Sequence, residues 1–252
     1  MRRTLLIRPG AIGDSILGFP ALEHLRSDYT EVWVRSEILP LVGSFCNSAR
    51  SIASTGLDLL EIEPSKKTID ELASFHEIHS WYGANRAEFR NVVRELPFVF
   101  HTALPPDDGS VHAADFFAEQ VGAPIPAVPR IPLKGPWHGR MVIHPYSGSV
   151  RKNWPYERWV ELSRRMPVEW AQDRFEDLGE LAAWIAGASV FVGNDSGITH
   201  LAAAVGTPVV ALFGATNPLV WSPRGDKVRV IERGQMGDIG VEDVLHAVRE
   251  FL

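Results

Sequence analysis

The sequence is short of the residues and patterns that mark several classes of protein. Its one cysteine, Cys46, excludes an internal disulfide framework and a cysteine-based metal site, and it suits a reducing compartment. The first apolar run stops at Arg8-Pro9-Gly10, too soon for the core of a signal peptide, and no stretch approaches the roughly 20 apolar residues of a membrane span. We therefore expect a cytoplasmic protein, or one bound peripherally at the inner face of the cytoplasmic membrane.

Basic charge is also scarce. The 252 residues include 25 lysines and arginines against 31 aspartates and glutamates, which gives a net charge of -6. A protein whose main partner is nucleic acid would carry a basic footprint, so that class is excluded. Any phosphate binding must come from a local arrangement of residues.

Several enzyme motifs are missing. The sequence contains neither the G-x-S-x-G turn of many serine hydrolases nor the phosphate loop of P-loop NTPases, and the glycines after Arg8 lack the dinucleotide-binding spacing. His76 and His79 have a spacing that could ligate a metal, but only Glu77 accompanies them, which favours structural polar residues. We expect no metal and no cofactor.

What the sequence does have is alternation of short apolar runs with segments of helical spacing, which predicts a mostly parallel, doubly wound α/β sheet. In the first half we expect strands at 5–7, 32–34 and 98–101, and helices at 12–26, 39–45, 68–75 and 86–96. In the second half we expect strands at 141–144, 168–171, 190–192, 208–213 and 228–231, and helices at 155–166, 178–188 and 241–252.

The two halves are separated by a segment rich in proline. Residues 122–136 hold five prolines and two glycines, which are incompatible with a helix interior or a central strand. We place a domain boundary there, with domains at 1–133 and 134–252. Two Rossmann-like domains facing across a cleft would bind ligands at the carboxyl ends of their strands.

The segment 190–213 is the most informative. It predicts a buried strand, a polar turn (Gly193-Asn194-Asp195-Ser196-Gly197), a helix of small residues and a second strand. The unpaired amides and the dipole of such a helix start favour an anion, and Thr199 and His200 lie within its first turns. The simpler interpretation is that Asp195 or Ser196 only caps the helix.

Two other loops follow strands and could face the same cleft. Asp14 lies at the start of the first helix, where it either complements the helix dipole or projects into the cleft as a general base. The loop 144–154 offers Ser147 and Ser149 hydroxyls with Arg151 and Lys152, a set that suits a diphosphate or forms a solvated basic turn. Trp154 and Trp159 in or near this loop are expected to pack in the core.

Together the three loops resemble glycosyltransferase family 9, the ADP-heptose:lipopolysaccharide heptosyltransferases and their relatives. The matching stretches are IRPGAIGDSILGFPALEHLR, IHPYSGSVRKNWPYERWVEL and VGNDSGITHLAAAVGTPVVALFGATNP. The resemblance implies a GT-B fold of two Rossmann-like domains, an acceptor domain followed by a donor domain. It also implies that Asp14 is the catalytic base and that the nucleotide sugar's phosphates meet a donor-binding set of Ser147, Lys152, Asp195, Ser196, Gly197, Thr199 and His200.

The implied activity is inverting, metal-independent transfer of a heptose or related sugar from a nucleotide-diphospho-sugar such as ADP-heptose to a glycan or glycolipid acceptor. The segment that precedes the donor motif in the family is compressed here to residues 167–181, where Glu169, Gln172 or Asp173 could meet the nucleoside. Two alternatives stay open: another GT-B reaction, such as sugar-nucleotide epimerisation or hydrolysis, and a non-catalytic nucleotide-sugar-binding protein.

Overall fold

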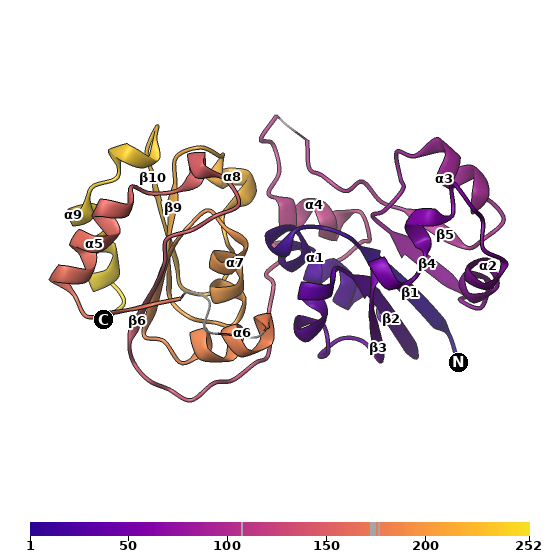
Figure 1. Ribbon diagram of the computed structural model, residues 1–252, viewed down its shortest axis with the longest axis horizontal. Helices are drawn as coiled ribbons and strands as arrows, with labels where there is room; N and C mark the ends of the chain where they lie inside the picture. Colours follow the sequence, from indigo (N-terminus) through magenta and orange to yellow (C-terminus); the bar gives the residue numbers. More distant parts are fainter. Residues whose placement is uncertain (107, 172–174, 176) are drawn as a thin grey trace.

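The computed structural model describes residues 1–106, 108–171, 175 and 177–252, and it divides into two α/β lobes (Figure 1). The strands of the first lobe are β1 (Arg3–Arg8), β2 (Tyr29–Val34), β3 (Ser48–Ser51), β4 (Glu77–Ser80) and β5 (Phe98–Phe100). Its helices are α1 (Ile12–His24), α2 (Lys66–Ala73), α3 (Ala87–Val92) and α4 (Ala113–Glu119), with 3₁₀ turns η1 (Ser36–Leu41), η2 (Ile52–Ser54) and η3 (Leu57–Leu59).

The second lobe repeats this plan. Its strands are β6 (Met141–His144), β7 (Val168–Trp170), β8 (Val190–Asn194), β9 (Val209–Phe213) and β10 (Val228–Glu232). Its helices are α5 (Tyr156–Arg165), α6 (Leu178–Ala186), α7 (Gly197–Ala204), α8 (Pro218–Trp221) and α9 (Val241–Arg249), with 3₁₀ turns η4 (Val150–Lys152) and η5 (Met236–Asp238).

Both sheets are parallel and doubly wound. The strand orders are β3-β2-β1-β4-β5 and β10-β9-β8-β6-β7, and every pairing between the described strands is parallel. The order reverses direction beside β1 in the first sheet and between β6 and β8 in the second. These reversals are the switch points where α/β sheets bind ligands. The expected fold class, two Rossmann-like doubly wound domains, is confirmed.

Each sheet is covered by apolar residues on both faces, as its strands predict. In β1, Leu5 and Ile7 join one buried cluster while Leu6 joins the cluster on the opposite face, because successive side chains of a strand alternate. Trp154 and Trp159 pack edge to face in the core of the second lobe, with ring centroids 4.9 Å apart, so their structural role is confirmed.

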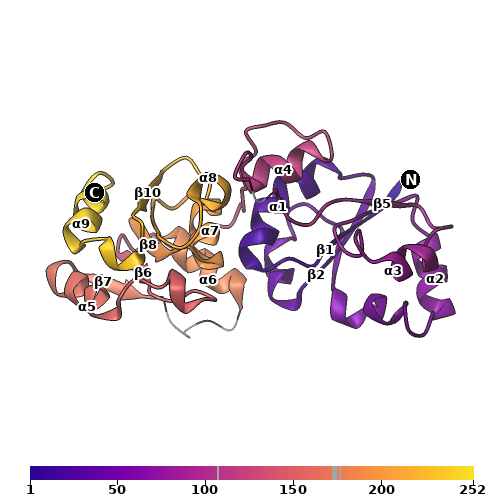
Figure 2. The same cartoon turned by 90° about the horizontal axis from the view of Figure 1, so that it is seen from above.

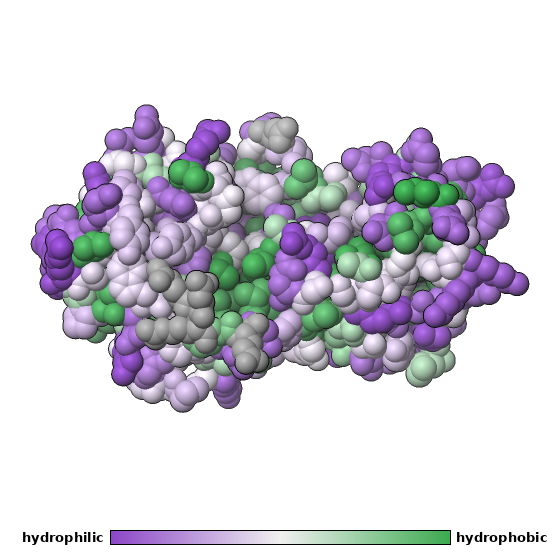
Figure 3. Space-filling model, in the orientation of Figure 1, coloured by the Kyte–Doolittle hydropathy of each residue, from purple (hydrophilic) through white to green (hydrophobic). Residues whose placement is uncertain are grey.

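The two lobes share one apolar cluster. The cluster around α1 also contains Ala182, Leu201, Ala204 and Val220 from the second lobe. In the two cartoon views α1 lies beside α7 at the junction of the lobes, and the space-filling view shows apolar residues gathered near that junction (Figures 1, 2 and 3). The predicted boundary at 133/134 falls within the segment that connects the two sheets, and the assignment of domains 1–133 and 134–252 stays a prediction.

Most of the expected elements are confirmed, with two corrections. The expected helix at 39–45 is wrong: the chain forms the 3₁₀ turn η1, which contains Pro40. Its backbone amides bond to the carbonyl three residues back, as those of Ile38 and Val42 do to Arg35 and Leu39, which is the 3₁₀ pattern of short connecting turns. The helix expected at 86–96 is shorter in the structure, where α3 ends at Val92.

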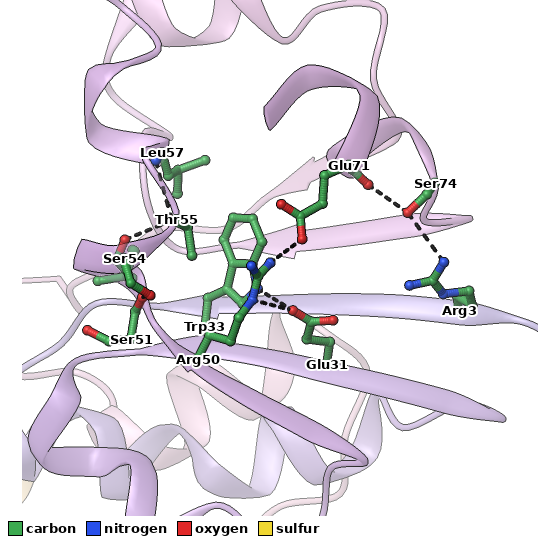
Figure 4. Close-up of polar contacts among 11 residues, drawn as sticks. Arg3, Glu31, Trp33, Arg50, Ser51, Ser54, Thr55, Leu57, Glu71 and Ser74 are labelled. Atoms are coloured by element: carbon green, nitrogen blue, oxygen red, sulfur yellow. Dashed lines mark hydrogen bonds and ion pairs between the residues drawn. The ribbon is translucent and has the colours of Figure 1, made fainter. Parts of the chain in front are cut away.

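A polar cluster fastens edge strand β3 to the first lobe (Figure 4). Arg50 of β3 donates from Nε to Glu31 of β2 at 2.8 Å, forms an ion pair with Glu71 of α2, and lies 4.8 Å from the ring centroid of Trp33. The indole of Trp33 donates to the same Glu31 carboxylate at 2.8 Å. A strand without a continuous apolar run is thereby held in the sheet by charge and a cation–π contact.

Candidate functional site

The predicted site residues lie on loops and helix starts at the carboxyl ends of strands next to the two switch points. Asp14 is in the first turn of α1, which follows β1; Lys152 ends η4, after β6; and Asp195 follows β8 directly. Asn194 joins the last two loops: its side-chain amide donates to Pro145 O at 2.7 Å and its Oδ1 accepts from Trp154 N at 3.1 Å. The buried side-chain amide of Asn194 therefore fixes the loop after β6 relative to the turn after β8.

The start of α1 and the start of α7 meet at two glycines. A methyl group at position 197 would lie 2.6 Å from Cβ of Ile12 and 3.1 Å from the amide nitrogen of Gly13. A methyl group at Gly13 would lie 3.0 Å from Cδ2 of His200. Side chains at these positions would push the helices apart, so glycine allows both positively polarised N-termini to border one cleft.

The start of α7 is arranged to leave amides for a ligand. Ser196 occupies the N-cap position, yet its side chain accepts no capping hydrogen bond from the described residues; its Oγ lies 3.2 Å from Oγ1 of Thr199. Thr199 is fully buried and donates from Oγ1 to Asn194 O at 2.6 Å, so this hydroxyl braces the turn. The amides of Gly197 and Ile198 come before the first backbone hydrogen bonds of α7. Unpaired amides at the start of a helix are the groups that bind anions.

Lys152 and Asp195 form an ion pair at the mouth of this turn. Nζ of Lys152 lies 2.7 Å from Oδ2 of Asp195, which also accepts from Oγ1 of Thr216 at 2.6 Å. The Asp195 side chain is 6% exposed and that of Lys152 is 32% exposed. The aspartate is therefore anchored, while the lysine keeps donors available to a ligand.

His200 is buried beside the same turn. Burial lowers its pKa to about 4, with Asp195 opposing the shift and His112 and Lys152 adding to it, so the imidazole is neutral near pH 7. Its Nδ1 is buried and finds no hydrogen-bond partner in the part of the chain that the structure describes. A buried polar nitrogen without a partner at the edge of a cleft is suited to a ligand group.

These residues border one cleft of about 460 Å³ between the lobes. Its lining includes six of the predicted site residues: Asp14, Lys152, Asp195, Ser196, Gly197 and His200. Ser147 and Thr199 contribute differently, because their side chains support the loops. Oγ of Ser147 lies 2.8 Å from both Ser149 O and Oδ1 of Asn153.

Gly148 and Ser149 of the loop after β6 also border the cleft, where the sequence predicted that loop to contribute. The remaining lining residues were not predicted to contact a ligand: Ala11, Gly13, Leu104, Thr216 and Trp221. Thr216 follows β9, so the rule that ligands bind beyond carboxyl strand ends could have found it. Leu104 lies in the first lobe and Trp221 in the second, and only the folded arrangement brings them together.

Of the three residues considered as nucleoside contacts, the structure describes one. Gln172 and Asp173 lie outside the described residues. Glu169 lies on β7 and forms an ion pair with Arg140 at 2.6 Å, in which the Glu169 side chain is 24% exposed. The carboxylate is therefore already engaged by a neighbouring cation.

The histidines considered as metal ligands have protein partners. Nδ1 of His76 accepts from Arg3 N at 3.2 Å, and Nδ1 of His79 lies 2.9 Å from Nε2 of His101. Across the described residues, no group of three His, Cys, Asp or Glu side chains is arranged to hold a metal ion. A search of the same residues also finds no helix with the length and apolarity to cross a membrane.

Two lobes, each with a parallel, doubly wound sheet of five strands, are the arrangement of the GT-B class of α/β proteins. Residues 176–244 match the family model of glycosyltransferase family 9 (heptosyltransferase). The chain is thus similar to glycosyltransferase family 9 over these residues, and its fold is that of the GT-B class.

Curated relatives match over short segments. The chain is 52% identical over 44 residues to lipopolysaccharide heptosyltransferase 3 of Escherichia coli, covering 18% of this chain and 13% of the relative. It is 44% identical over 55 residues to lipooligosaccharide heptosyltransferase 2 of Haemophilus influenzae, covering 22% and 16%. A third match, lipopolysaccharide heptosyltransferase 1 of Pseudomonas aeruginosa, is 36% identical over 96 residues and covers 27% of each chain. The aligned parts therefore span well under two thirds of these relatives.

Solved structures match over the whole fold. A family 9 glycosyltransferase from Veillonella parvula superposes with a TM-score of 0.78 at 17% identity, covering 99% of this chain and 97% of the other. The ADP-heptose lipopolysaccharide heptosyltransferase II of E. coli gives 0.77 at 16% identity, with coverage of 100% and 98%. E. coli heptosyltransferase WaaC with ADP gives 0.72 at 17% identity, with coverage of 99% and 100%. At these identities the likeness establishes the fold.

Proposed function

We propose that the protein is an inverting, metal-independent glycosyltransferase that moves a heptose or a related sugar from a nucleotide-diphospho-sugar to a hydroxyl of a glycan or glycolipid acceptor. The observation that carries this proposal is the convergence of Asp14 from one lobe with Lys152 and the start of α7 from the other on a single cleft. A base and a diphosphate site on opposite walls are the two halves that glycosyl transfer needs.

The donor's diphosphate would occupy the start of α7. The amides of Gly197 and Ile198, the helix dipole and Lys152 supply positive charge there. His200, being neutral, can donate one hydrogen bond from its imidazole. As a structural neighbour is described with ADP and another with an ADP-linked fluoro-heptose, an ADP-linked donor is the first candidate.

Asp14 would act as the general base. It would accept the proton of the acceptor hydroxyl as that oxygen forms a bond to the anomeric carbon, while the bond from this carbon to the diphosphate breaks and its electron pair leaves with the nucleotide. Of the carboxylates described on the cleft lining, Asp195 is held by Lys152 and Thr216, which leaves Asp14 for the acceptor. One available carboxylate suits a single displacement, which inverts the anomeric centre.

The leaving group gains negative charge as the bond breaks. Lys152 and the α7 amides are fixed before the substrate arrives, so they can stabilise that charge without reorganisation. This is the task that a divalent cation performs in other transferases, and it supports the metal-independent form of the proposal.

The test compares two variants, one expected to impair sugar transfer and the other expected to impair nucleotide binding. Asp14→Asn should lower transfer from ADP-heptose by on the order of 10²-fold to 10⁴-fold, with calorimetric affinity for ADP nearly unchanged. Lys152→Ala should weaken ADP binding about 10-fold to 100-fold, because a charge-assisted contact to phosphate is lost.

Each outcome has a clear meaning. Full transfer by Asp14→Asn would remove Asp14 from the mechanism, and unchanged ADP affinity in Lys152→Ala would remove the phosphate role. Nucleotide release without any acceptor would indicate hydrolysis or another GT-B reaction. Binding of ADP-heptose without turnover on any acceptor would favour a nucleotide-sugar-binding protein.

A further inference from the structure

An arginine is buried directly behind Asp14. Arg8 ends β1 and is 2% exposed, which makes it one of the largest fully buried side chains of the protein. Its guanidinium carbon lies 4.0 Å from the ring centroid of Phe117 on α4 and 5.6 Å from that of Trp81. The charge is therefore enclosed by aromatic rings instead of water.

The hydrogen bonds of this guanidinium are few. Nη2 donates to the backbone oxygen of Asp14 at 3.1 Å, and Nε is buried with no partner among the residues described. Gly18 of α1 provides the space, since a methyl group there would lie 3.1 Å from Nε. A glycine inside a helix is less favourable than alanine, so the fold accepts a local loss of stability where the guanidinium lies.

Arg8 remains a cation at neutral pH. Burial lowers its pKa to about 10, and the nearby Asp14 opposes the shift. A buried cation held by so few hydrogen bonds is a poor source of stability, because apolar residues of similar size serve a core as well or better. Its position behind the first turn of α1 therefore calls for a role other than stability.

The charges around the cleft indicate that role. Lys152 and Asp195 offset each other and His200 is neutral, so the Asp14 carboxylate would otherwise face an incoming diphosphate as an uncompensated negative charge. Arg8 is a buried cation in contact with Asp14, and it is not among the residues that line the cleft. It compensates this charge from a position where the donor cannot reach it.

We propose that Arg8 is a positioning residue for Asp14: it fixes the first turn of α1 through the Asp14 carbonyl, and its charge offsets that of the carboxylate beside an anionic donor. This inference rests on the proposed function, in which Asp14 receives the acceptor proton. It adds a second residue, outside the cleft, on which that proton transfer depends.

Other titratable groups lie near Arg8 and Asp14. His101 stacks on Trp81, with ring centroids 4.5 Å apart, and contacts His79. Asp115 of α4 is paired with Arg224. Lys152, Asp195 and His200 border the cleft with Asp14. Asp14 is the charged group that acts on Arg8, whereas Arg8 is not among the causes of the lowered pKa values of His101 and His200. A difference between the two pH profiles therefore reports on Arg8.

The experiment uses Arg8→Met, Arg8→Lys and, as a matched control, Arg3→Met. Arg3 lies on the same strand and also covers aromatic rings, those of Tyr29 and Phe75, but it lies at the opposite end of β1. Transfer kinetics are measured as a function of pH together with thermal unfolding.

We expect Arg8→Met to fold with an unchanged or higher unfolding temperature, to lose kcat on the order of 10²-fold and to raise the KM for the donor, because the Asp14 charge then faces the diphosphate uncompensated. The acid limb of its kcat/KM profile should move to higher pH. Arg8→Lys should restore the position of that limb because it keeps the charge, and Arg3→Met should match wild type. Wild-type kcat and pH profile in Arg8→Met would overturn the proposal, as would a loss of stability alone.

A second measurement separates this inference from the proposed function. Carbon-13 NMR of the Asp14 backbone carbonyl, assigned by comparison with Asp14→Asn, reports the hydrogen bond from Arg8 in the free protein whether or not any sugar is transferred. The resonance should shift in Arg8→Met and keep its wild-type position in Arg3→Met. An unchanged resonance in Arg8→Met would overturn the role of Arg8 even if the transferase activity were established.

Discussion

At the scale of single residues, the site depends on where each charge is placed. Asp195 is held by Lys152 and Thr216, Asp14 lies over a buried arginine, and His200 is kept neutral by burial. The cleft can therefore receive an anion with its ionisation states already set. This arrangement lowers the free energy of unfolding when the pH changes.

The buried histidine predicts acid destabilisation. In the folded protein the pKa of His200 is lowered to about 4, from an ordinary value of 6.5. Below about pH 6.5 the unfolded chain binds a proton that the folded chain refuses, so the free energy of unfolding falls as the pH drops towards 4. Denaturant unfolding should show that His200→Gln loses less stability between pH 7 and pH 5 than wild type does, by on the order of 1 kcal/mol.

The control for this prediction is His246→Gln, since the His246 side chain is 80% exposed. That variant should follow the wild-type pH dependence. His101, His112 and His144 also have pKa values lowered to about 4 by burial, so part of the acid destabilisation will persist in His200→Gln. Equal losses of stability in His200→Gln and wild type would contradict the assignment of a buried neutral imidazole.

At the scale of helices and strands, much could be predicted from the sequence because buried parallel strands are continuous apolar runs. Segments such as 190–192 and 208–213 are of this kind, and β8 and β9 lie there. The polar strands β3 (SARS) and β4 (EIHS) were missed, because they are held by backbone pairing and by contacts such as that of Arg50. Their position depends on neighbours distant in sequence.

Part of the candidate site could likewise be predicted from the sequence. Asp14 lies at the start of the helix after β1 and the turn 195–200 follows β8 directly, so residue types and order were enough to predict their chemistry. Arg8 was considered only as part of a loop, because nothing in the sequence shows that Phe117 and Gly18 enclose its guanidinium. The bracing roles of Ser147 and Thr199 likewise depend on which acceptors the folded loops present.

The contact between helix starts gives a prediction at this scale. In Gly197→Ala the new methyl group would lie 2.6 Å from Cβ of Ile12, so α1 and α7 must separate. We expect a loss of about 1–3 kcal/mol in unfolding free energy and weaker ADP binding, because the amides and Lys152 no longer share one geometry. Gly43→Ala is the control, since a methyl group there meets nothing within 4 Å. Wild-type stability and ADP affinity in Gly197→Ala would show that the close contact is dispensable.

At the scale of the whole molecule, the lobes are joined by more than the connecting segment. One apolar cluster crosses the junction, and Arg224 of the second lobe forms two hydrogen bonds to the carboxylate of Asp115 on α4, at 2.5 and 2.6 Å. The same carboxylate accepts from Ala127 N at 2.7 Å. Helix, connecting segment and second lobe therefore meet at one side chain. This junction sets the width of the cleft between the lobes.

Removing that charge should loosen the lobes. Asp115→Asn keeps an acceptor for Ala127 but leaves Arg224 without its ion pair; both side chains are mostly buried, at 16% and 21% exposure, so we expect a loss of about 2–4 kcal/mol. Scanning calorimetry should then resolve two transitions where wild type shows one, because each lobe has its own core. Arg130→Ala removes the exposed pair with Asp226 and should change stability by less than about 1 kcal/mol. If Asp115→Asn is as mild as Arg130→Ala, the apolar cluster alone holds the lobes together, and the width of the cleft is set by α1 against α7.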